Sequence, residues 1–299
     1  MGKDGLAATS IAGIRLSNPL MNAAYLHSKT ASDVKRLAKS ACGAVVVGSI
    51  TVEARKPNKD GGYWRHKDGL YSLNSFGMPN AGYTYFEEQL PALVRTAHEN
   101  NKPLIANIAG FLPEEFARLI KLAEQSKADM AELNLGCPNA WEGGNQKRII
   151  SYHPSLVGEV LAAVKSLKTS VKVCVKISPL PPDLLRDIAN EVSKSNCVDA
   201  VTATNSYPNA YFTSGTGKPT DILTGMTGRS LKPISLGVVK QLRGLLPESV
   251  DIIGCGGISS VNDVRDYIEA GASAVQLATA LMDEGLEVFS KLALSSKES

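Results

Sequence analysis

The fold is decided by three consecutive runs of sequence: LIANI (Leu104–Ile108), PEEFARLIKLAEQ (Pro113–Gln125) and MAELNL (Met130–Leu135). The two outer runs are short, continuous and mainly apolar, which is typical of parallel strands covered on both faces. The middle run repeats its apolar residues at helical spacing. Together they predict a strand–helix–strand unit whose two strands belong to one parallel sheet.

The same unit recurs along almost the whole chain. Eight runs have strand character: Pro19–Ala23, Ala44–Ile50, Leu104–Ile108, Met130–Leu135, Val171–Ile177, Ala200–Thr204, Asp251–Gly254 and Ala274–Leu277. Eight amphipathic runs separate or follow them: Ser32–Lys39, Tyr85–Glu99, Pro113–Gln125, Pro154–Leu167, Pro182–Lys194, Ser235–Leu246, Ser260–Ala270 and Glu284–Leu294. This order favours a parallel (β/α)8 barrel of the TIM type. An open doubly wound sheet is the alternative, but no GxGxxG motif follows an early strand.

The bulk composition fits a single barrel domain over residues 1–299. Such barrels commonly need about 250 residues. The apolar fraction of 43% and the charged fraction of 20% are ordinary for a globular protein and exclude a disordered one. The net charge of +3 is spread along the chain, without the clustered basic patch that nucleic-acid binding requires. We therefore expect no nucleic-acid partner.

Targeting signals and metal-binding patterns are also missing from the sequence. No apolar run resembles a signal peptide or is long enough to span a bilayer, so we expect a soluble cytoplasmic protein with no membrane partner. The five cysteines include no CxxC pair, and the four histidines lack the spacing of metal ligands. We expect buried free thiols, apart from Cys137, and no metal site.

Three long connections break the regular alternation of strands and helices. They run over residues 51–83, 136–153 and 206–232, and each follows the C-terminal end of a predicted strand. They contain asparagines, glycines, aromatic residues and one cysteine, and no regular structure is evident in them. Because barrels build their active sites from the loops at this end, we expect the functional site there.

The last two predicted strands end in small residues that suit a phosphate group. Paired glycines, Gly256 and Gly257, follow the first, and Ala278–Thr279 follow the second. Glycine lets a backbone approach a phosphate closely, and backbone N–H groups complete an anion site. A tight turn with small-residue packing is the plainer interpretation of either segment alone. Their occurrence together, in this order, favours a phosphate-bearing ligand.

The strand that ends at residue 135 leads into the most informative loop. Asn134 and Asn139 flank Cys137 there, in the run Asn134–Leu135–Gly136–Cys137–Pro138–Asn139. Carboxamides donate and accept hydrogen bonds, so the pair suits a flat heterocycle with alternating N–H and C=O groups. A desolvated thiol flanked by donors can serve as a base. Simple loop packing is the alternative for Cys137, and the two asparagines weaken it.

This run resembles the Asn-Leu-Ser-Cys-Pro-Asn signature of dihydroorotate dehydrogenases, in the soluble class that uses cysteine. Further segments resemble the family in the same order: Asn18–Ala23, Asn74–Asn80, Val175–Lys176, Asn205–Ser206, Gly225–Pro233, Gly256–Gly257 and Ala278–Thr279. The resemblance covers nearly the whole chain. The Asn74–Asn80 segment is similar to that of the homodimeric, fumarate-reducing subclass.

The resemblance implies an FMN-dependent oxidoreductase that converts (S)-dihydroorotate to orotate in pyrimidine biosynthesis, with Cys137 as the general base. It implies fumarate as electron acceptor, a homodimer, and a lid formed by residues 136–153. The implied substrate-binding residues are Asn74, Gly77, Met78, Asn134, Asn139, Asn205 and Ser206. The implied FMN-binding residues are Ala23, Ala24, Ser49, Asn134, Lys176, Gly228, Gly256, Gly257, Ala278 and Thr279.

Two positions depart from the family pattern. Gly48 stands where the family has a lysine that contacts both flavin and the orotate carboxylate, and Tyr25 stands where a glycine lies near the flavin. Arg55, Lys56 or Lys29 are candidates to replace the missing cation. Two other functions therefore stay open: a paralogue that uses the same thiol and flavin on another dihydropyrimidine or unsaturated carbonyl compound, and a flavin-binding barrel without turnover.

Overall fold

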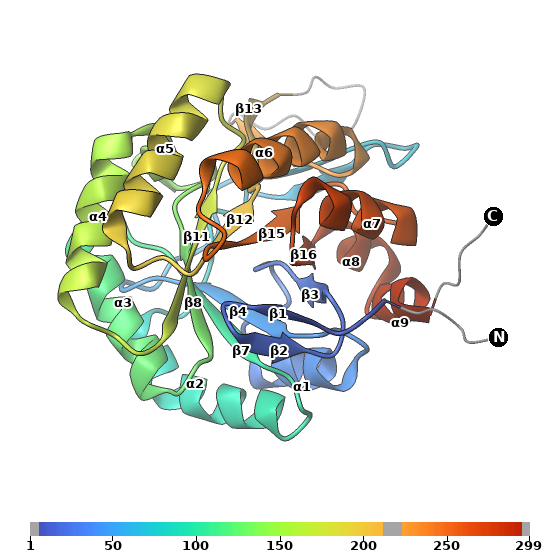
Figure 1. Cartoon of the computed structure of the whole chain (residues 1–299), viewed down its shortest axis with the longest axis horizontal. Helices are drawn as coiled ribbons and strands as arrows, with labels where there is room; N and C mark the ends of the chain where they lie inside the picture. Colours follow the sequence, from blue (N-terminus) through green and yellow to red (C-terminus); the bar gives the residue numbers. More distant parts are fainter. Residues whose placement is uncertain (1–5, 212–222, 295–299) are drawn as a thin grey trace.

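The computed structural model describes residues 6–211 and 223–294, and the central part of the third long loop lies outside these ranges. The core of the molecule is an eight-stranded parallel sheet whose helices form an outer ring around it (Figure 1). Its strands are β3 (Leu20–Asn22), β4 (Val45–Ile50), β7 (Leu104–Ile108), β8 (Met130–Asn134), β11 (Lys172–Ile177), β12 (Ala200–Ala203), β15 (Asp251–Cys255) and β16 (Ala274–Leu277).

The strand order identifies the sheet as a barrel. Neighbouring strands follow the order β3-β16-β15-β12-β11-β8-β7-β4, so the first strand pairs with the last. A parallel bridge between Met21 and Ala44 joins β3 to β4 and brings the two remaining edges together. The predicted (β/α)8 barrel is confirmed, and the open doubly wound sheet is excluded because the order never reverses.

The outer helices cover the sheet with their apolar faces. They are α1 (Ala31–Lys39), α2 (Tyr83–His98), α3 (Pro113–Gln125), α4 (Pro154–Ser166), α5 (Pro182–Ser195), α6 (Lys232–Leu245), α7 (Val261–Ala270), α8 (Thr279–Glu284) and α9 (Glu287–Leu294). Thr30 caps α1 and Ser260 caps α7, each in a capping box with the aspartate three residues later. The helix predicted over 284–294 is wrong in extent, because Gly285 has a φ of +71° and separates α8 from α9.

An antiparallel hairpin packs at the N-terminal end of the barrel. Strands β1 (Thr9–Ile11) and β2 (Ile14–Leu16) pair with each other, and the side chains of Ile11 and Leu16 belong to the apolar cluster inside the barrel. The backbone N–H of Ala12 donates to the carboxylate of Asp251 at the start of β15, at 2.7 Å. This end of the barrel is therefore filled with apolar side chains.

Regular structure appears within the long connections, where none was expected. Strands β5 (Tyr63–Arg65), β6 (Ser72–Asn74), β13 (Tyr207–Ala210) and β14 (Thr224–Thr227) form an antiparallel sheet in the order β13-β14-β6-β5. Strands β9 (Trp141–Glu142) and β10 (Asn145–Gln146) form a hairpin, and short 3-10 helices span η1 (Ile150–Tyr152) and η2 (Arg229–Leu231). The four-stranded sheet joins two loops that are far apart in sequence. A local pattern of residues therefore could not predict it.

Candidate active site

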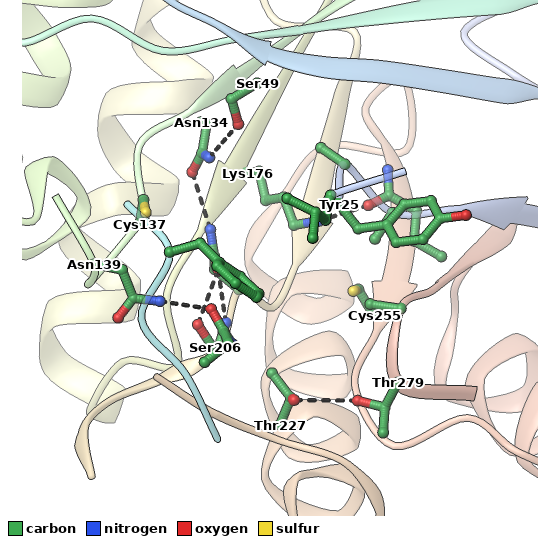
Figure 2. Close-up of a pocket in the computed structure, with 18 of the residues that line it drawn as sticks. Tyr25, Ser49, Asn134, Cys137, Asn139, Lys176, Ser206, Thr227, Cys255 and Thr279 are labelled. Carbon is green, nitrogen blue, oxygen red and sulfur yellow. Dashed lines mark hydrogen bonds between the residues drawn. The ribbon is translucent and has the colours of Figure 1, made fainter. Parts of the chain in front are cut away.

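A cavity lies at the C-terminal ends of the barrel strands, where barrel enzymes carry their active sites (Figure 2). It encloses about 1200 Å³ of space free of protein atoms, part of it open to solvent. Every site residue predicted from the sequence lines it: Ala23, Ala24, Ser49, Asn74, Gly77, Met78, Asn134, Cys137, Asn139, Lys176, Asn205, Ser206, Gly228, Gly256, Gly257, Ala278 and Thr279. The structure thus brings together residues spread over some 250 positions of the chain.

Cys137 follows β8 on a tight turn that a glycine makes possible. A Cβ at Gly136 would lie 2.5 Å from the backbone nitrogen of Ser178, so only glycine fits there. The Cys137 side chain is half-buried and free. Burial raises the pKa of its thiol above the ordinary value, while backbone N–H groups and the charges of Arg55 and Lys29 act to lower it. The raised pKa favours the protonated thiol at neutral pH, and the side chain can act as a base only after it loses this proton.

The predicted carboxamides form pairs around the cavity. Asn139 donates to the Asn74 side-chain oxygen at 2.7 Å, and Asn205 donates to that of Asn134 at 2.9 Å. Asn134 in turn donates to the Ser49 hydroxyl at 3.1 Å. The Oδ1 atom of Asn139 is buried and has no hydrogen-bond partner among the described residues. A donor on a bound molecule can satisfy this oxygen, since buried acceptors rarely stay unpaired.

Asn58, which the sequence did not single out, and Arg55, which it offered only as a replacement for the missing cation, hold the loops of the site in place. The Asn58 side-chain nitrogen donates to the carbonyl of Ser75 at 2.7 Å and to that of Asn139 at 2.8 Å. The Arg55 guanidinium donates to the carbonyls of Gly77 at 3.0 Å and Trp141 at 3.2 Å. The loop around Gly77 is thereby fixed to the loop that carries Cys137.

The loop of residues 136–153 carries the β9–β10 hairpin beside the cavity. Gly143 and Gly144 form its turn with φ values of +56° and +80°. The side chain of Gln146 donates to the carbonyl of Pro138 at 2.7 Å, which ties the hairpin to the Cys137 turn. Trp141 lies outside the cavity lining, whereas Tyr25 belongs to it.

A buried polar network supports Lys176. Its ammonium donates to the Gln276 side-chain oxygen at 2.6 Å, and Gln276 donates to the Glu132 carboxylate at 2.6 Å. Glu132 also accepts from Asn107 and Thr202, each at 2.6 Å. Burial opposes the charged lysine, but the Cys255 thiol and the Glu132 carboxylate outweigh this and raise the pKa of Lys176.

The network contributes further lining residues that were not predicted. Asn107 and Gln276 line the cavity, and the Oδ1 atom of Asn107 is buried without a partner among the described residues. Both lie inside strands. An isolated amide in an apolar run is usually a buried side chain with its hydrogen bonds made inside the protein, so no sequence pattern assigned these two to the site. Tyr25, Gly48 and Lys29, which the sequence singled out without assigning them a role in binding, also line the cavity. The remaining unpredicted lining residues are Leu26, Tyr63, Phe76, Pro79, Thr204, Thr227, Leu231, Cys255, Ile258, Leu277 and Met282.

The glycines after β15 form a cradle that side chains would fill. A Cβ at Gly256 would lie 2.3 Å from the Ser235 hydroxyl oxygen, and one at Gly257 would lie 2.8 Å from the Gly228 carbonyl oxygen. Both have positive φ, +138° and +68°. The backbone N–H groups of Gly257 and Thr279 have no acceptor among the described residues. Such a backbone surface suits a phosphate, as the sequence predicts.

The labelled side chains separate into two sides in Figure 2. Cys137, Asn134 and Asn139 lie on one side of the view and Tyr25 on the other, with Lys176 between them. Burial raises the pKa of Tyr25 to about 12, so its hydroxyl stays protonated at neutral pH. The amide-and-thiol side can recognise a planar heterocycle, and the lysine and glycine side can hold a larger phosphate-bearing group.

Comparison with known proteins gives one consistent result. A family model described as dihydroorotate dehydrogenase matches residues 6–296. The catalytic subunit of a dihydroorotate dehydrogenase B (NAD(+)) from Methanothermobacter thermautotrophicus is 33% identical over 289 residues, covering 95% of this chain and 90% of the relative. A dihydroorotate dehydrogenase A (fumarate) from Lactococcus lactis subsp. cremoris is 32% identical over 298 residues, covering 95% of this chain and 91% of the relative.

A solved structure supports the same fold. The structure of DHODH in complex with ferulenol, from Eimeria tenella, superimposes with a TM-score of 0.80. The match covers 96% of this chain and 82% of that one, at 21% sequence identity. Within the described residues, no helix is both long and apolar enough to cross a bilayer.

Proposed function

The chain belongs to the dihydroorotate dehydrogenase family of oxidoreductases acting on CH–CH groups, and from this premise we propose that it oxidises (S)-dihydroorotate to orotate with bound FMN. One observation carries the proposal. Cys137 and the four predicted asparagines line the same cavity as Lys176 and the glycine cradle, so a thiol, candidate groups for ring recognition and a candidate phosphate site share one space.

The residues of the cradle fit FMN. Gly256, Gly257, Ala278 and Thr279 would hold its phosphate through backbone N–H groups, with Gly228 against the same wall. Lys176 would hold a positive charge beside the ring, where negative charge develops on reduction. FMN, when bound, supplies the acceptor for the hydride that leaves C6 of the substrate. Ala23, Ala24 and Ser49 would form the remaining wall, with Asn134 shared between cofactor and substrate.

Substrate recognition falls to the amide side of the cavity. Asn74, Asn134, Asn139 and Asn205 would exchange their mutual hydrogen bonds for bonds to the pyrimidine ring, with Ser206 beside them. The backbone N–H groups of Gly77 and Met78 would take the carboxylate. Neither N–H has an acceptor among the described residues, which supports this role.

The proton step belongs to Cys137. As a thiolate, it would take the proton from C5 of dihydroorotate, and the charges of Arg55 and Lys29 would stabilise that thiolate. The asparagines would hold the ring so that C5 faces the sulfur. The β9–β10 hairpin would exclude water from this reaction.

Fumarate is the proposed electron acceptor. Relatives named dihydroorotate dehydrogenase A (fumarate) from Lactococcus lactis and Streptococcus uberis are each 32% identical to this chain. The 33% identity to a B-type catalytic subunit is too close to separate the two classes by identity. The substrate loop Asn74–Asn80 is what favours fumarate. We also propose that the protein is a cytoplasmic homodimer, and this part of the proposal rests only on the resemblance to the fumarate-reducing subclass.

Gly48 and Tyr25 support a second candidate, a paralogue acting on another dihydropyrimidine or unsaturated carbonyl compound. Both residues line the cavity, so its walls differ from the family pattern at two places. The first test is anaerobic mixing of flavin-loaded protein with dihydroorotate while flavin absorbance is followed. Bleaching, followed by recovery with fumarate, supports the proposal. Bleaching only by a different dihydropyrimidine would favour the paralogue as the function of this chain. No bleaching by any substrate would indicate a flavin-binding barrel without turnover.

A further inference from the structure

Besides Lys176, the cavity contains a second lysine, Lys29, and no acidic side chain among the described residues forms an ion pair with it. Lys29 lies between β3 and α1, lines the cavity and is half-buried. Its ammonium donates to the backbone carbonyl of Pro79 at 2.5 Å. Among the residues that the structure describes, no carboxylate lies within ion-pair distance of this ammonium. A half-buried cation bound only to a neutral carbonyl is set to accept an anion.

Asp33, the acidic residue that acts on the charge of Lys29, is already bonded to the backbone. The Asp33 carboxylate accepts from the backbone N–H groups of Lys29 at 3.3 Å and Thr30 at 3.1 Å, as part of the capping box of α1. It influences the Lys29 ammonium only through space. Burial lowers the pKa of Lys29 to about 8, although Asp33 and Cys137 favour its charged form. A bound anion would relieve this penalty.

Lys176, the other lysine in the cavity, is differently placed. Its ammonium is bonded to Gln276 and lies beside the buried carboxylate of Glu132, so its charge is already compensated. Of the three cations considered as replacements for the missing lysine, Arg55 and Lys56 lie outside the cavity lining. Lys29 is thus the candidate with access to a bound molecule.

Position 48 helps to hold the turn that precedes Lys29. A Cβ there would lie 2.2 Å from the Asn107 carbonyl oxygen, and the backbone has a φ of +131°, so this backbone accepts only glycine. The turn before Lys29 packs against that glycine. The Gly48 N–H donates to the Ser28 carbonyl at 3.3 Å, and the Ser28 hydroxyl donates to the Gly48 carbonyl at 3.2 Å.

The Pro79 carbonyl holds the Lys29 ammonium beside the substrate loop. The two residues directly before Pro79, Gly77 and Met78, have φ values of +80° and +60°, and their N–H groups have no acceptor among the described residues. Consecutive N–H groups in such a turn form a concave anion site. A full positive charge and two backbone donors therefore border one part of the cavity.

We propose that Lys29 binds the carboxylate of the substrate and makes the site selective for ring acids over their neutral analogues. This inference rests on the proposed function, since it names the group that recognises the acid of dihydroorotate. The carboxylate would lie between the Lys29 ammonium and the N–H groups of Gly77 and Met78, with the ring extending towards Cys137. Lys29 would act in binding and would take no proton from C5.

The test compares an acid with its ester. Flavin-loaded protein is titrated calorimetrically with orotate and with methyl orotate, for the parent, Lys29→Met, Lys29→Arg and Lys56→Met. Loss of a buried charge partner predicts a rise in the orotate Kd of about 30-fold or more in Lys29→Met. Methyl orotate should bind Lys29→Met and the parent alike, Lys29→Arg should keep most of the orotate affinity, and Lys56→Met, altered at an exposed site, should match the parent.

The outcomes separate this inference from the proposed function. An unchanged orotate Kd in Lys29→Met, or an equal loss for acid and ester, overturns the role of Lys29 even if dihydroorotate bleaches the parent flavin. Selective loss of orotate supports it even if dihydroorotate causes no bleaching, in which case only the proposed function fails. If the parent binds no orotate, both fail. Lys29→Gln repeats the measurement if circular dichroism shows Lys29→Met to be misfolded.

Discussion

The two ends of the barrel are built from different chemistry. At the N-terminal end, Ile11 and Leu16 of the β1–β2 hairpin extend an apolar cluster that contains Met21, Ile105 and Ile253. At the C-terminal end, the same strands run into amides, lysines, glycines and a thiol. The difference teaches that one end stabilises the fold and the other can carry buried polar groups, because stability is secured elsewhere.

The largest effect on activity without an effect on stability is expected from Cys137→Ala, at the C-terminal end of the barrel. Loss of a general base should slow flavin reduction by dihydroorotate by about 10²- to 10⁴-fold, with bound flavin and thermal stability nearly unchanged. Stopped-flow absorbance measures the rate. Cys197→Ala is the matched control, since this thiol is half-buried outside the cavity lining and bonds to the Leu161 carbonyl. A parent-like rate in Cys137→Ala would remove the proposed base.

The converse change is Ile11→Ala at the apolar end. Truncating this buried side chain should lower the free energy of unfolding by about 2–5 kcal/mol, through lost burial and a residual cavity. The reduction rate of the folded protein should not change. Denaturant unfolding and stopped-flow reduction measure the two effects, with exposed Ile268→Ala as control. A large loss of rate would show that the two ends are not independent.

A substitution in the glycine cradle after β15 should have an effect of intermediate size, on the affinity for FMN. Gly257→Ala places a methyl group 2.8 Å from the Gly228 carbonyl oxygen at a positive φ, which should weaken FMN binding by about 1–3 kcal/mol. Gly237→Ala is the control, because a Cβ there meets nothing within 4 Å and lies within helix α6. Fluorescence titration of the apoprotein with FMN measures both. Equal FMN affinities would contradict a phosphate site at Gly257.

The reaction should also depend on pH in a direction set by Cys137. Burial raises the pKa of this thiol, so at saturating dihydroorotate the reduction rate should rise up to about tenfold per pH unit between pH 7 and 9. Lys29 faces the same region and has a pKa of about 8, so orotate binding should weaken as pH rises through this value. A flat rate profile would contradict a thiolate base.

The smallest effect is expected from the two capping boxes. Thr30→Ala on α1 and Ser260→Ala on α7 should each lower the free energy of unfolding by about 1 kcal/mol. Only Thr30 adjoins Lys29, so only Thr30→Ala should also weaken orotate binding. Equal orotate affinities in both variants would show that the α1 cap does not position Lys29.

The barrel and the Asn134–Asn139 loop could be predicted from local runs of sequence, whereas most other site residues are predicted only from the resemblance to the family. Continuous apolar strands, helix periodicity and the Asn134–Asn139 loop each depend on neighbouring residues. The pairing of β14 with β6 could not, since it joins Gly225 to Asn74 across the chain. Nor could the access of Lys29 to the cavity, which depends on how the turn before α1 packs against Gly48.

Asn58 has a mechanical consequence. A single side-chain nitrogen joins Ser75 and Asn139, on two loops that the chain reaches more than sixty residues apart. Movement of either loop alone would break one of these hydrogen bonds, so the link favours movement of the two loops together. Weakening this link, as in Asn58→Ala, would then be expected to alter the entry and the exit of a bound molecule together.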